Sequence, residues 1–384
     1  VVIVRGDRIE RVGTGDGAVP AGAKVVDLRP LTGIPGMIDA HTHMTYWWDH
    51  AKGTSPWSRL GSFSTPVLVY LAAENARRTL ETGVTTVRDL GGVDYADIAM
   101  RTLINRGSMP GPRMFVAGRG LHISSYLIAP GAERADNGRA DGVDAVLLAS
   151  RQQLAAGADW IKMYGSTGSD QDVTGFQTFT YEEMKAAADV AHQAGKRIAI
   201  HSYGPDGARD AVRAGTNSVE HATGMDDATI SEMVKRGTIY VPTVDHNRYY
   251  IDHRDEFGYD DAVVARLTDY IARNFETMKK AARAGVLMAM GSDAVFTGFG
   301  ENTRELEWFV KAGMTPTQAL ATATTNGATL LGLSDRLGAV APGYFADIVA
   351  VEGDPATDIN AVIRGVRWVM KGGEVVVDRR HAIR

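Results

Sequence analysis

The middle of the chain alternates between short apolar runs and longer amphipathic stretches. Eight of the apolar runs have the length and the aliphatic, β-branched content of buried strands. Because most of them are followed by a stretch of helical periodicity, the pattern predicts strand–helix units with parallel strands. The expected strands are Met37–His43, Thr85–Leu90, Arg113–Ala117, Trp160–Tyr164, Arg197–His201, Ser218–His221, Ile239–Val244 and Val286–Asp293.

The amphipathic stretches carry apolar residues at helical spacing with polar residues between them. One of them begins with Thr180 and Glu183 in the order of a capping box, which predicts a helix start at Tyr181. The expected helices are Pro66–Thr82, Asp144–Ala156, Tyr181–Ala194, Asp206–Ala214, Asp227–Arg236, Asp261–Ala284 and Asn302–Ala312.

Eight strands and their helices within about 300 residues are the content of a closed (β/α)8 barrel, the TIM barrel. An open, doubly wound sheet is the alternative, and it would carry a glycine-rich dinucleotide turn after an early strand. The nearest candidate, Gly118-Arg119-Gly120, lacks the third glycine of that turn. The predicted fold class is therefore α/β, with a TIM barrel at its centre.

The residue pattern at both ends of the chain differs from that of the middle: short β-rich runs are separated by glycine-containing turns. We expect them to combine into a small β-sandwich domain of residues 1–34 and 338–384, next to a barrel of residues 35–337. The alternative is that each end decorates the barrel separately. The expected strands of this domain are Val1–Arg5, Arg8–Val12, Lys24–Leu28, Ala346–Val351, Ala361–Met370 and Glu374–Asp378.

Composition excludes several classes of function. The 384 residues hold 41 Lys and Arg against 46 Asp and Glu, and this net charge of −5 argues against nucleic acid and anionic membranes as partners. No apolar run approaches the roughly 18 residues of a membrane span. Cysteine is absent, so disulfides, thiolate ligands and a cysteine nucleophile are excluded. Any metal must then be held by histidine, carboxylate or a less usual ligand.

The compartment is left open by the sequence. The chain starts at Val1 without an initiator methionine, and we expect that a segment upstream of it has been removed or is not included. A cytoplasmic protein and a periplasmic or secreted one both fit a chain without cysteine.

Polar residues stand at the carboxyl ends of several expected strands, where TIM barrels carry their chemistry. His41 and His43 are two residues apart on the first strand, so their side chains face the same way. Paired imidazoles can hold a metal ion, since histidine is the commonest metal ligand. A lone pair of this kind also occurs by chance, and other ligands are needed to complete a site.

Lys162 stands among apolar residues in the fourth expected strand, where burial of an ammonium group is costly. One interpretation is a lysine that extends to the barrel mouth and forms a salt bridge. The other is a desolvated amine that reacts with CO2 to form a carbamate, which would be an anionic bridging ligand.

Further candidate ligands end the fifth, sixth and eighth expected strands. They are His201, His221 and Asp293. Any one of them could be structural, but four histidines and one aspartate at strand ends together indicate a shell of nitrogen and oxygen donors. Such a shell suits Zn²⁺, with Mn²⁺, Co²⁺ and Fe²⁺ as further candidates.

The order of these residues, His-x-His, Lys, His, His and Asp, resembles the amidohydrolase superfamily with a binuclear metal centre. The run Pro35–His43 is similar to its opening motif, and Pro342–Val349 with Gly353-Asp354-Pro355 is similar to its closing β-sandwich motif. The resemblance covers nearly the whole chain. Thr85–Asp89 and Ala158–Lys162 look like the branch of Xaa-Pro dipeptidases (prolidases), imidazolonepropionase-like proteins and ochratoxin-hydrolysing amidohydrolases.

This resemblance implies two divalent metal ions, with Zn²⁺ expected. His41, His43 and Asp293 would bind the more buried ion and His201 and His221 the second, with N6-carboxylated Lys162 bridging them. A metal-bridging hydroxide would be the nucleophile, because two cations lower the pKa of water towards neutrality. Asp293 would accept its proton and pass it to the leaving amine.

Other residues are candidates for substrate contact or catalysis. Relatives often carry a Gly-Gly-His segment after the third strand, but here the histidine is shifted to His122, which either polarises the carbonyl or packs the loop. Tyr203 is the other candidate for contacting the substrate or the oxyanion. Arg88 would hold a substrate carboxylate or pair with Asp89 or another structural partner, and His246 would line the mouth. Loop aromatics would form an apolar wall or pack the loops; they are Trp47, Trp48, Phe296 and Phe299.

These residues predict an amidohydrolase that cleaves an amide bond to a C-terminal apolar, aromatic or prolyl amino acid. The substrates would be small dipeptides or N-acyl amino acids, including ochratoxin-like aryl amides. The same centre would also serve a lactonase, an organophosphate triesterase or a cyclic-amide hydrolase of the imidazolonepropionase type. A catalytically silent scaffold is a remote alternative, since all six ligands are present. By analogy with relatives, we expect a homo-oligomer.

Overall fold

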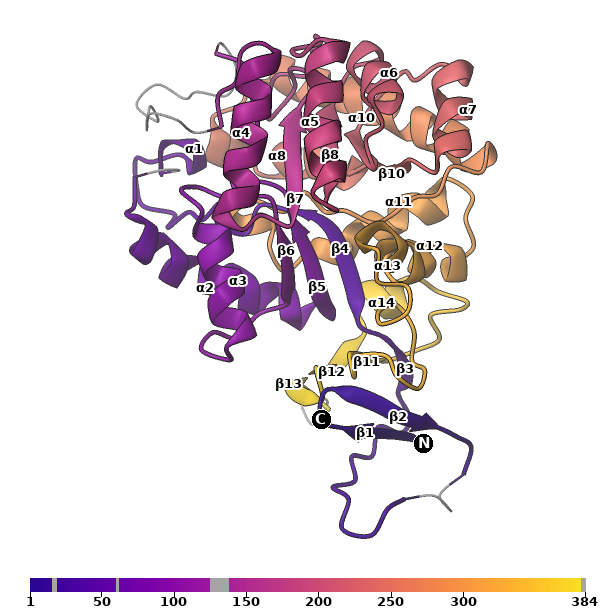
Figure 1. The fold of residues 1–384 in the computed structure, drawn as a ribbon. Coiled ribbons are helices and arrows are strands. Elements are labelled where there is room, and N and C mark those ends of the chain that lie inside the picture. Colours follow the sequence, from indigo (N-terminus) through magenta and orange to yellow (C-terminus); the bar gives the residue numbers. More distant parts are fainter. Residues whose placement is uncertain (16–18, 60–61, 125–137, 381–384) are drawn as a thin grey trace.

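The structure is a computed structural model of the 384 residues, and it describes all of them except 16–18, 60–61, 125–137 and 381–384. Figure 1 shows a large body of strands and helices with a small sheet beneath it. Both chain ends lie at that small sheet.

Two parallel sheets form most of the barrel, and their strands are joined in chain order. These strands are buried almost throughout. The first sheet contains β4 (Met37–Thr42), β5 (Val84–Asp89) and β6 (Arg113–Val116). The second contains β7 (Trp160–Tyr164), β8 (Arg197–Ser202), β9 (Ser218–His221) and β10 (Ile239–Val241).

Backbone hydrogen bonds close the ring between the two sheets. Leu121, just beyond β6, pairs with β7, where the Tyr164 amide donates to the Leu121 carbonyl at 2.9 Å. On the other side, the Tyr240 amide of β10 donates to the Leu287 carbonyl at 3.0 Å, and the Ala40 amide of β4 donates to the Met290 carbonyl at 2.8 Å. The predicted TIM barrel is thereby confirmed.

The eighth expected strand, Val286–Asp293, is not a regular strand. It occupies the eighth place in the ring, but it pairs with its neighbours only at single bridges, at Met288 and at Ala294. Gly291 explains part of this, because a Cβ there would lie 2.5 Å from Val241 and 2.8 Å from His41. The backbone also turns at Asp293, where φ is +51°. The close approach of Gly291 to its neighbours and the turn at Asp293 interrupt the ladder of backbone hydrogen bonds.

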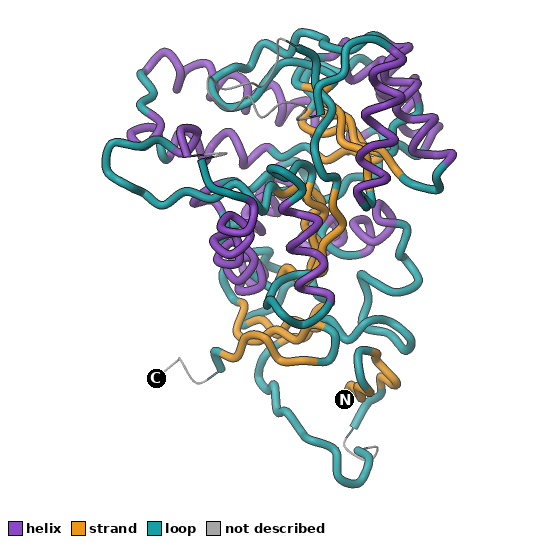
Figure 2. Tube along the Cα trace, turned by 60° about the vertical axis from the view of Figure 1, so that its left-hand side comes forward, coloured by secondary structure: helices purple, strands orange, loops and turns teal. Residues whose placement is uncertain are grey.

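Helices cover the outside of the barrel, as Figure 2 shows for the strands enclosed between them. The capping box of Thr180 and Glu183 is confirmed, with the Thr180 amide donating to the Glu183 carboxylate at 2.8 Å. The long helices are α2 (Thr65–Glu81), α3 (Ala96–Asn105), α4 (Val143–Ala156), α5 (Tyr181–Gln193), α6 (Pro205–Ala214), α7 (Asp227–Arg236), α8 (Val244–Asp252) and α10 (Asp261–Arg283). The short ones are α1 (Pro56–Arg59), α9 (Arg254–Phe257), η1 (Phe296–Gly298), η2 (Asn302–Arg304), α11 (Glu305–Lys311), α12 (Pro316–Thr322), α13 (Thr325–Leu331) and α14 (Asn360–Ile363).

Two elements near the barrel mouth differ from the prediction. The expected strand Ile239–Val244 stops at Val241, because α8 starts at Val244 and its first amides donate to the buried carboxylate of Glu305. The expected helix Asn302–Ala312 is divided into η2 and α11. Helix α3 was not predicted.

The two chain ends meet in one antiparallel sheet. β3 (Thr32–Pro35) pairs with β11 (Ile348–Val351), which continues to β12 (Val366–Lys371) and β13 (Glu374–Asp378). The hairpin of β1 (Val2–Arg5) and β2 (Arg8–Val12) touches the same region through a bridge between Arg8 and Phe345. This pairing supports a joint small domain, while the boundaries 1–34 and 338–384 against 35–337 stay a prediction.

Two of the expected terminal strands are wrong in detail. Lys24–Leu28 forms no strand, and its side chains are mostly exposed. Ala361–Met370 starts as helix α14 and becomes a strand only at Val366.

Among the described helices, none combines the length and the apolar character that crossing a membrane requires.

Candidate metal centre

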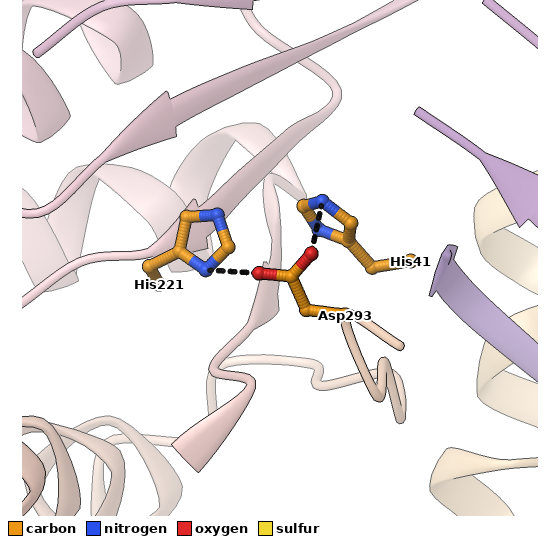
Figure 3. Close-up of side chains that lie close together, drawn as sticks. All are labelled: His41, His221 and Asp293. Atoms are coloured by element: carbon orange, nitrogen blue, oxygen red, sulfur yellow. Dashed lines mark ion pairs between the residues drawn. The ribbon is translucent and has the colours of Figure 1, made fainter. Parts of the chain in front are cut away.

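Three buried side chains from distant parts of the chain meet at the carboxyl end of the barrel (Figure 3). The Nε2 atom of His41 lies 3.5 Å from Oδ1 of Asp293, and the Nδ1 atom of His221 lies 3.8 Å from Oδ2 of the same carboxylate. One ligand atom from each lies within 4.8 Å of the other two, a spacing that would hold a metal ion.

The other three expected ligands surround this group. Nε2 of His43 lies 3.2 Å from Oδ1 of Asp293, and Nζ of Lys162 lies 3.5 Å from Nε2 of His41. The ring centroid of His201 is 4.5 Å from that of His221. The structure therefore brings all six predicted residues together. We call them the floor cluster: His41, His43, Lys162, His201, His221 and Asp293.

Two of these side chains are carried by backbone in a strained conformation. His221 and Asp293 have φ values of +72° and +51°, a left-handed region that non-glycine residues rarely adopt. Such conformations persist only where the surroundings enforce them, often at functional sites. At Asp293 the amide donates to the His41 carbonyl at 2.7 Å, which ties the turn to β4.

Burial sets the protonation of the cluster. It lowers the pKa of His41 to about 4 and, with the charge of Lys162, holds the pKa of His201 well below its ordinary value. Burial also lowers the pKa of Lys162 to about 8, although the acidic Glu220 and Asp293 oppose this. Burial alone would raise the pKa of Asp293, but the neighbouring histidines outweigh it and keep the carboxyl ionised.

Neutral imidazoles beside an ionised carboxylate are what a divalent cation requires, because ligands must be deprotonated. One atom of the cluster is also left without a partner. Nε2 of His201 is buried and has no hydrogen bond to any residue that the structure describes. A buried polar atom of this kind calls for an explanation, and a bound metal supplies one. The donor set therefore fits a divalent metal ion.

A second layer orients His41. Its Nδ1 atom is 2.8 Å from Oε2 of Glu220, and Nη2 of Arg88 lies 2.9 and 3.0 Å from the two oxygens of that carboxylate. Glu220 and Arg88 are both fully buried. Partners of this kind fix the tautomer and direction of a ligand histidine. Glu220 was missed, although an acid within a buried strand is a signal that could have identified it.

This network does not fit the expectation that Arg88 holds a substrate carboxylate. The Nε atom of Arg88 also donates to the Ala40 carbonyl at 2.6 Å, and its Nη1 atom donates to Oγ of Ser218 at 2.8 Å. The guanidinium group is therefore hydrogen-bonded to acceptors within the protein. The geometry favours the structural alternative, with Glu220 as the partner in place of Asp89.

Tyr203 and His246 both lie against the floor cluster. The Tyr203 ring stacks on His201 with centroids 5.0 Å apart, and its hydroxyl donates to Asn247 at 3.2 Å. His246, from α8, has its Nε2 atom 3.3 Å from Oδ2 of Asp293, which places it deeper than the mouth position expected of it. Their roles stay predictions.

His122 follows β6, where its Nδ1 atom lies 3.1 Å from the carbonyl of Ile123. Its backbone pairs with residues 138 and 140, on the far side of the segment 125–137, which is outside the described residues. Whether His122 polarises a substrate carbonyl stays a prediction.

Ring contacts connect four aromatic side chains to His43 of the floor cluster or to His246 beside it, and we call them the aromatic rim: Tyr46, Trp57, Tyr250 and Phe296. Tyr46 stacks on His43 at 4.7 Å, and Trp57 packs edge-on against Phe296 at 5.1 Å. Only Phe296 was predicted. Trp47 lies elsewhere, since its Nε1 atom donates to Glu74 of α2 at 3.2 Å and its ring packs 5.7 Å from Phe63.

Comparison with known proteins identifies the family. The model of the amidohydrolase family matches residues 32–376. An ochratoxinase of Aspergillus niger is 29% identical over 374 residues, covering 89% of this chain and 75% of the relative. An imidazolonepropionase of Streptomyces griseus is 24% identical over 387 residues, covering 91% of this chain and 85% of the relative.

A solved structure of a Xaa-Pro dipeptidase with methionine bound in its active site is 30% identical to this chain. It superimposes with a TM-score of 0.87 and covers 97% of this chain and 94% of its own. Amidohydrolases generally use a divalent metal centre, as the floor cluster leads one to expect. The chain belongs to the amidohydrolase family and is a hydrolase that acts on amide bonds.

Proposed function

We propose that the protein cleaves the amide bond to a C-terminal apolar, aromatic or prolyl amino acid. Its substrates are small dipeptides or N-acyl amino acids, and ochratoxin-like aryl amides fall within this class. The observation that carries the proposal is the aromatic rim, which lies directly on a ligand cluster, with Tyr46 stacked on His43 at 4.7 Å. The likeness to a Xaa-Pro dipeptidase and to an ochratoxinase supports the same class.

The six side chains of the floor cluster would hold two divalent ions, which we propose to be Zn²⁺. In this assignment His41, His43 and Asp293 hold one ion, His201 and His221 hold the other, and N6-carboxylated Lys162 lies between them. When bound, such ions lower the pKa of a water molecule towards neutrality and polarise the scissile carbonyl. The lowered pKa of Lys162, about 8, supports carboxylation because the neutral amine is the form that reacts with CO2.

Proton transfer would fall to Asp293. Its carboxylate is ionised, so it can accept a proton from the attacking water and deliver it to the nitrogen of the leaving amine. His246, 3.3 Å from Oδ2, would keep that carboxylate in place. Tyr203, stacked on His201, would turn its hydroxyl proton from Asn247 to the developing oxyanion, and the aromatic rim would exclude bulk water.

One alternative has an observation in its favour, namely cyclic-amide hydrolysis, because an imidazolonepropionase is among the relatives. Lactones and organophosphate triesters are further substrates that such a centre would accept. A silent scaffold is opposed by the convergence of all six donors.

The test is a substrate screen with the metal-loaded protein, ranked by kcat/KM. Benzoyl-Phe, benzoyl-Leu, benzoyl-Pro and the matching dipeptides would be compared with benzoyl-phenethylamine, which keeps the aromatic amine but lacks the carboxylate. We expect the carboxylate-bearing amides to be preferred at least tenfold. Turnover of lactones without turnover of any amide would overturn the proposal, and less than one tightly bound metal ion per chain would favour the scaffold.

A further inference from the structure

Helix α8 carries a buried side-chain amide to the edge of the floor cluster. Asn247 lies on this helix directly after His246, whose Nε2 atom is 3.3 Å from Oδ2 of Asp293. The residue is buried, with only 2% of its surface exposed. The start of the helix is held in place, because its first two amides donate to the buried carboxylate of Glu305 at 2.9 and 2.8 Å. Asn247 therefore has a fixed position beside the ligand residues.

One end of this amide is hydrogen-bonded and the other is not. Oδ1 of Asn247 accepts the hydroxyl proton of Tyr203 at 3.2 Å. Nδ2 of the same amide is buried and has no hydrogen-bond acceptor among the residues that the structure describes. Leaving a buried N–H donor without an acceptor is costly, so such a group calls for an explanation. A substrate that brings an acceptor supplies one.

Tyr203 places this unpartnered donor next to the reacting centre. The Tyr203 ring stacks on His201 with centroids 5.0 Å apart and packs edge-on against His221 at 5.2 Å. The proposed function assigns the hydroxyl of Tyr203 to the developing oxyanion, and the Asn247 amide contacts that hydroxyl. Nδ2 therefore belongs to the same amide that touches the oxyanion-binding group.

The proposed substrates carry an acceptor close to the oxyanion. In a dipeptide or an N-acyl amino acid, the carboxylate is bonded to the carbon that follows the scissile nitrogen, so it lies near the carbonyl oxygen under attack. A group that binds this carboxylate must then lie near the group that binds the oxyanion, as Asn247 does beside Tyr203. Arg88 does not meet this need, because its guanidinium is hydrogen-bonded to acceptors beneath the floor cluster.

We propose that Asn247 recognises the C-terminal carboxylate of the substrate by donating a hydrogen bond to it from Nδ2. A neutral N–H group suits this task, since a hydrogen bond to an ionised acceptor is stronger than one between neutral groups. Oδ1 holds Tyr203 until the hydroxyl proton turns to the oxyanion. This inference rests on the proposed function and deepens it, because it names the residue that distinguishes carboxylate-bearing amides. Asn247 binds the substrate and takes no part in proton transfer.

The experiment compares three amides that differ only in the group that Asn247 would bind. Benzoyl-Phe carries the carboxylate, benzoyl-phenylalaninamide carries a neutral carboxamide, and benzoyl-phenethylamine carries hydrogen there. The carboxylate preference is kcat/KM for benzoyl-Phe divided by kcat/KM for benzoyl-phenethylamine, measured with the metal-loaded protein. For the wild type we expect a preference of at least tenfold. The carboxamide should fall between the other two, because its carbonyl can accept the same hydrogen bond without a charge.

Two substitutions remove the donor. Asn247→Asp keeps the shape of the side chain and an oxygen for Tyr203, whereas Asn247→Leu removes both polar atoms. We expect the carboxylate preference to fall below twofold in both variants. In Asn247→Asp, kcat/KM for benzoyl-phenethylamine should stay within threefold of the wild-type value, because that compound never used the donor.

Asn274→Asp is the matched control. Asn274, on α10, is also buried, and its Oδ1 also accepts from a tyrosine hydroxyl, that of Tyr240 at 2.8 Å. Its Nδ2, however, already donates to the Pro242 carbonyl at 2.8 Å. This variant should lose stability but keep the carboxylate preference within twofold of the wild-type value.

Two results would overturn the inference and leave the proposed function standing. One is a carboxylate preference that persists in the Asn247 variants, as equal losses on both compounds would produce, since this shows a structural role alone. The other needs no variant and covers the case in which neither variant folds. It is a wild type that prefers benzoyl-Phe but cleaves the carboxamide no faster than benzoyl-phenethylamine, because such an enzyme recognises charge rather than a hydrogen-bond acceptor. A wild type without any carboxylate preference would overturn the proposed function as well.

Discussion

The floor cluster and the aromatic rim lie next to each other at one end of the barrel, yet they are built differently. Floor residues come from strands or strand ends, and their polar atoms approach to 3.2 Å, as between His43 and Asp293. Rim residues come from loops and helices that follow the strands, and Tyr46, Trp57 and Phe296 contact one another ring to ring, as Trp57 and Phe296 do at 5.1 Å. Hydrogen-bonded strands fix a ligand set closely, whereas loops allow the wall around it to vary.

The two regions also treat charge differently. Beneath the floor cluster, the buried charges of Arg88 and Glu220 pair with each other, and Glu220 also pairs with His41. The rim side chains are uncharged, and burial raises the pKa of both of its tyrosines, Tyr46 and Tyr250. Substitutions in each region should therefore fail in different ways.

The largest effect is expected at Lys162. Replacing it by alanine removes the proposed bridge between the metal ions, so activity should fall by several orders of magnitude and bound metal should drop below two ions per chain. Added acetate or propionate should restore part of the activity by standing in for the carbamate. Rates and metal content together measure this.

Lys185→Ala is the matched control, because that lysine pairs with Asp189 on the exposed face of α5. It should retain full activity. A fully active Lys162→Ala protein would refute the proposed carbamate bridge. It would also remove the main functional difference expected between the floor cluster and the aromatic rim.

A smaller effect is expected at Glu220, beneath the floor. Glu220→Gln weakens the anchor of His41 and leaves the buried charge of Arg88 unpaired. Metal affinity should fall about 10- to 100-fold. The free energy of unfolding of the metal-free protein should fall by about 3–5 kcal/mol. Metal titration and urea unfolding measure the two effects.

For comparison, Glu232→Gln breaks an exposed pair with Arg236 on α7. Exposed pairs contribute roughly 0–1 kcal/mol, so this variant should resemble the wild type. Equal losses in the two variants would mean that the layer under the floor cluster has no special part in holding His41.

The smallest effect is expected at Asp170, in the loop between β7 and α5, and has the opposite sign. The folded-state pKa of Asp170 is raised to about 7 from 3.8, so ionisation on going from pH 4 to pH 7 destabilises the folded protein. Asp170→Asn should match the wild type near pH 4 and exceed it by roughly 1–2 kcal/mol at pH 8, after allowance for partial exposure. Urea unfolding at both pH values measures this effect. A variant less stable than the wild type at pH 8 would contradict the raised pKa of the Asp170 carboxyl.

Sequence patterns identified the floor cluster because strand geometry is regular. Residues two apart on a strand face the same side, and the carboxyl ends of parallel strands meet at one face of a barrel. His41, His43, Lys162, His201 and His221 are all placed by these rules. Asp293 was identified as well, although its segment makes only isolated bridges.

The conformations of irregular segments could not be predicted from strand geometry. The early end of β10 depends on Glu305, which accepts the first amides of α8 from 60 residues away in the chain. Adjacent aromatic residues also diverge, since Tyr46 stacks on His43 while Trp47 turns to Glu74 of α2. Their common sequence context gives no sign of this, because each direction is set by the element that packs against it.

The sequence by itself determined the barrel, the order of the floor-cluster residues along it and the absence of any thiolate chemistry, because these depend on periodicity, strand ends and residue type. Only the tertiary structure decided that Arg88 pairs with Glu220, that His246 reaches Asp293, and that Glu305 accepts the first amides of α8. These three facts join segments far apart in the chain. Long-range packing brings such segments together, and no local pattern records which atoms will then be neighbours.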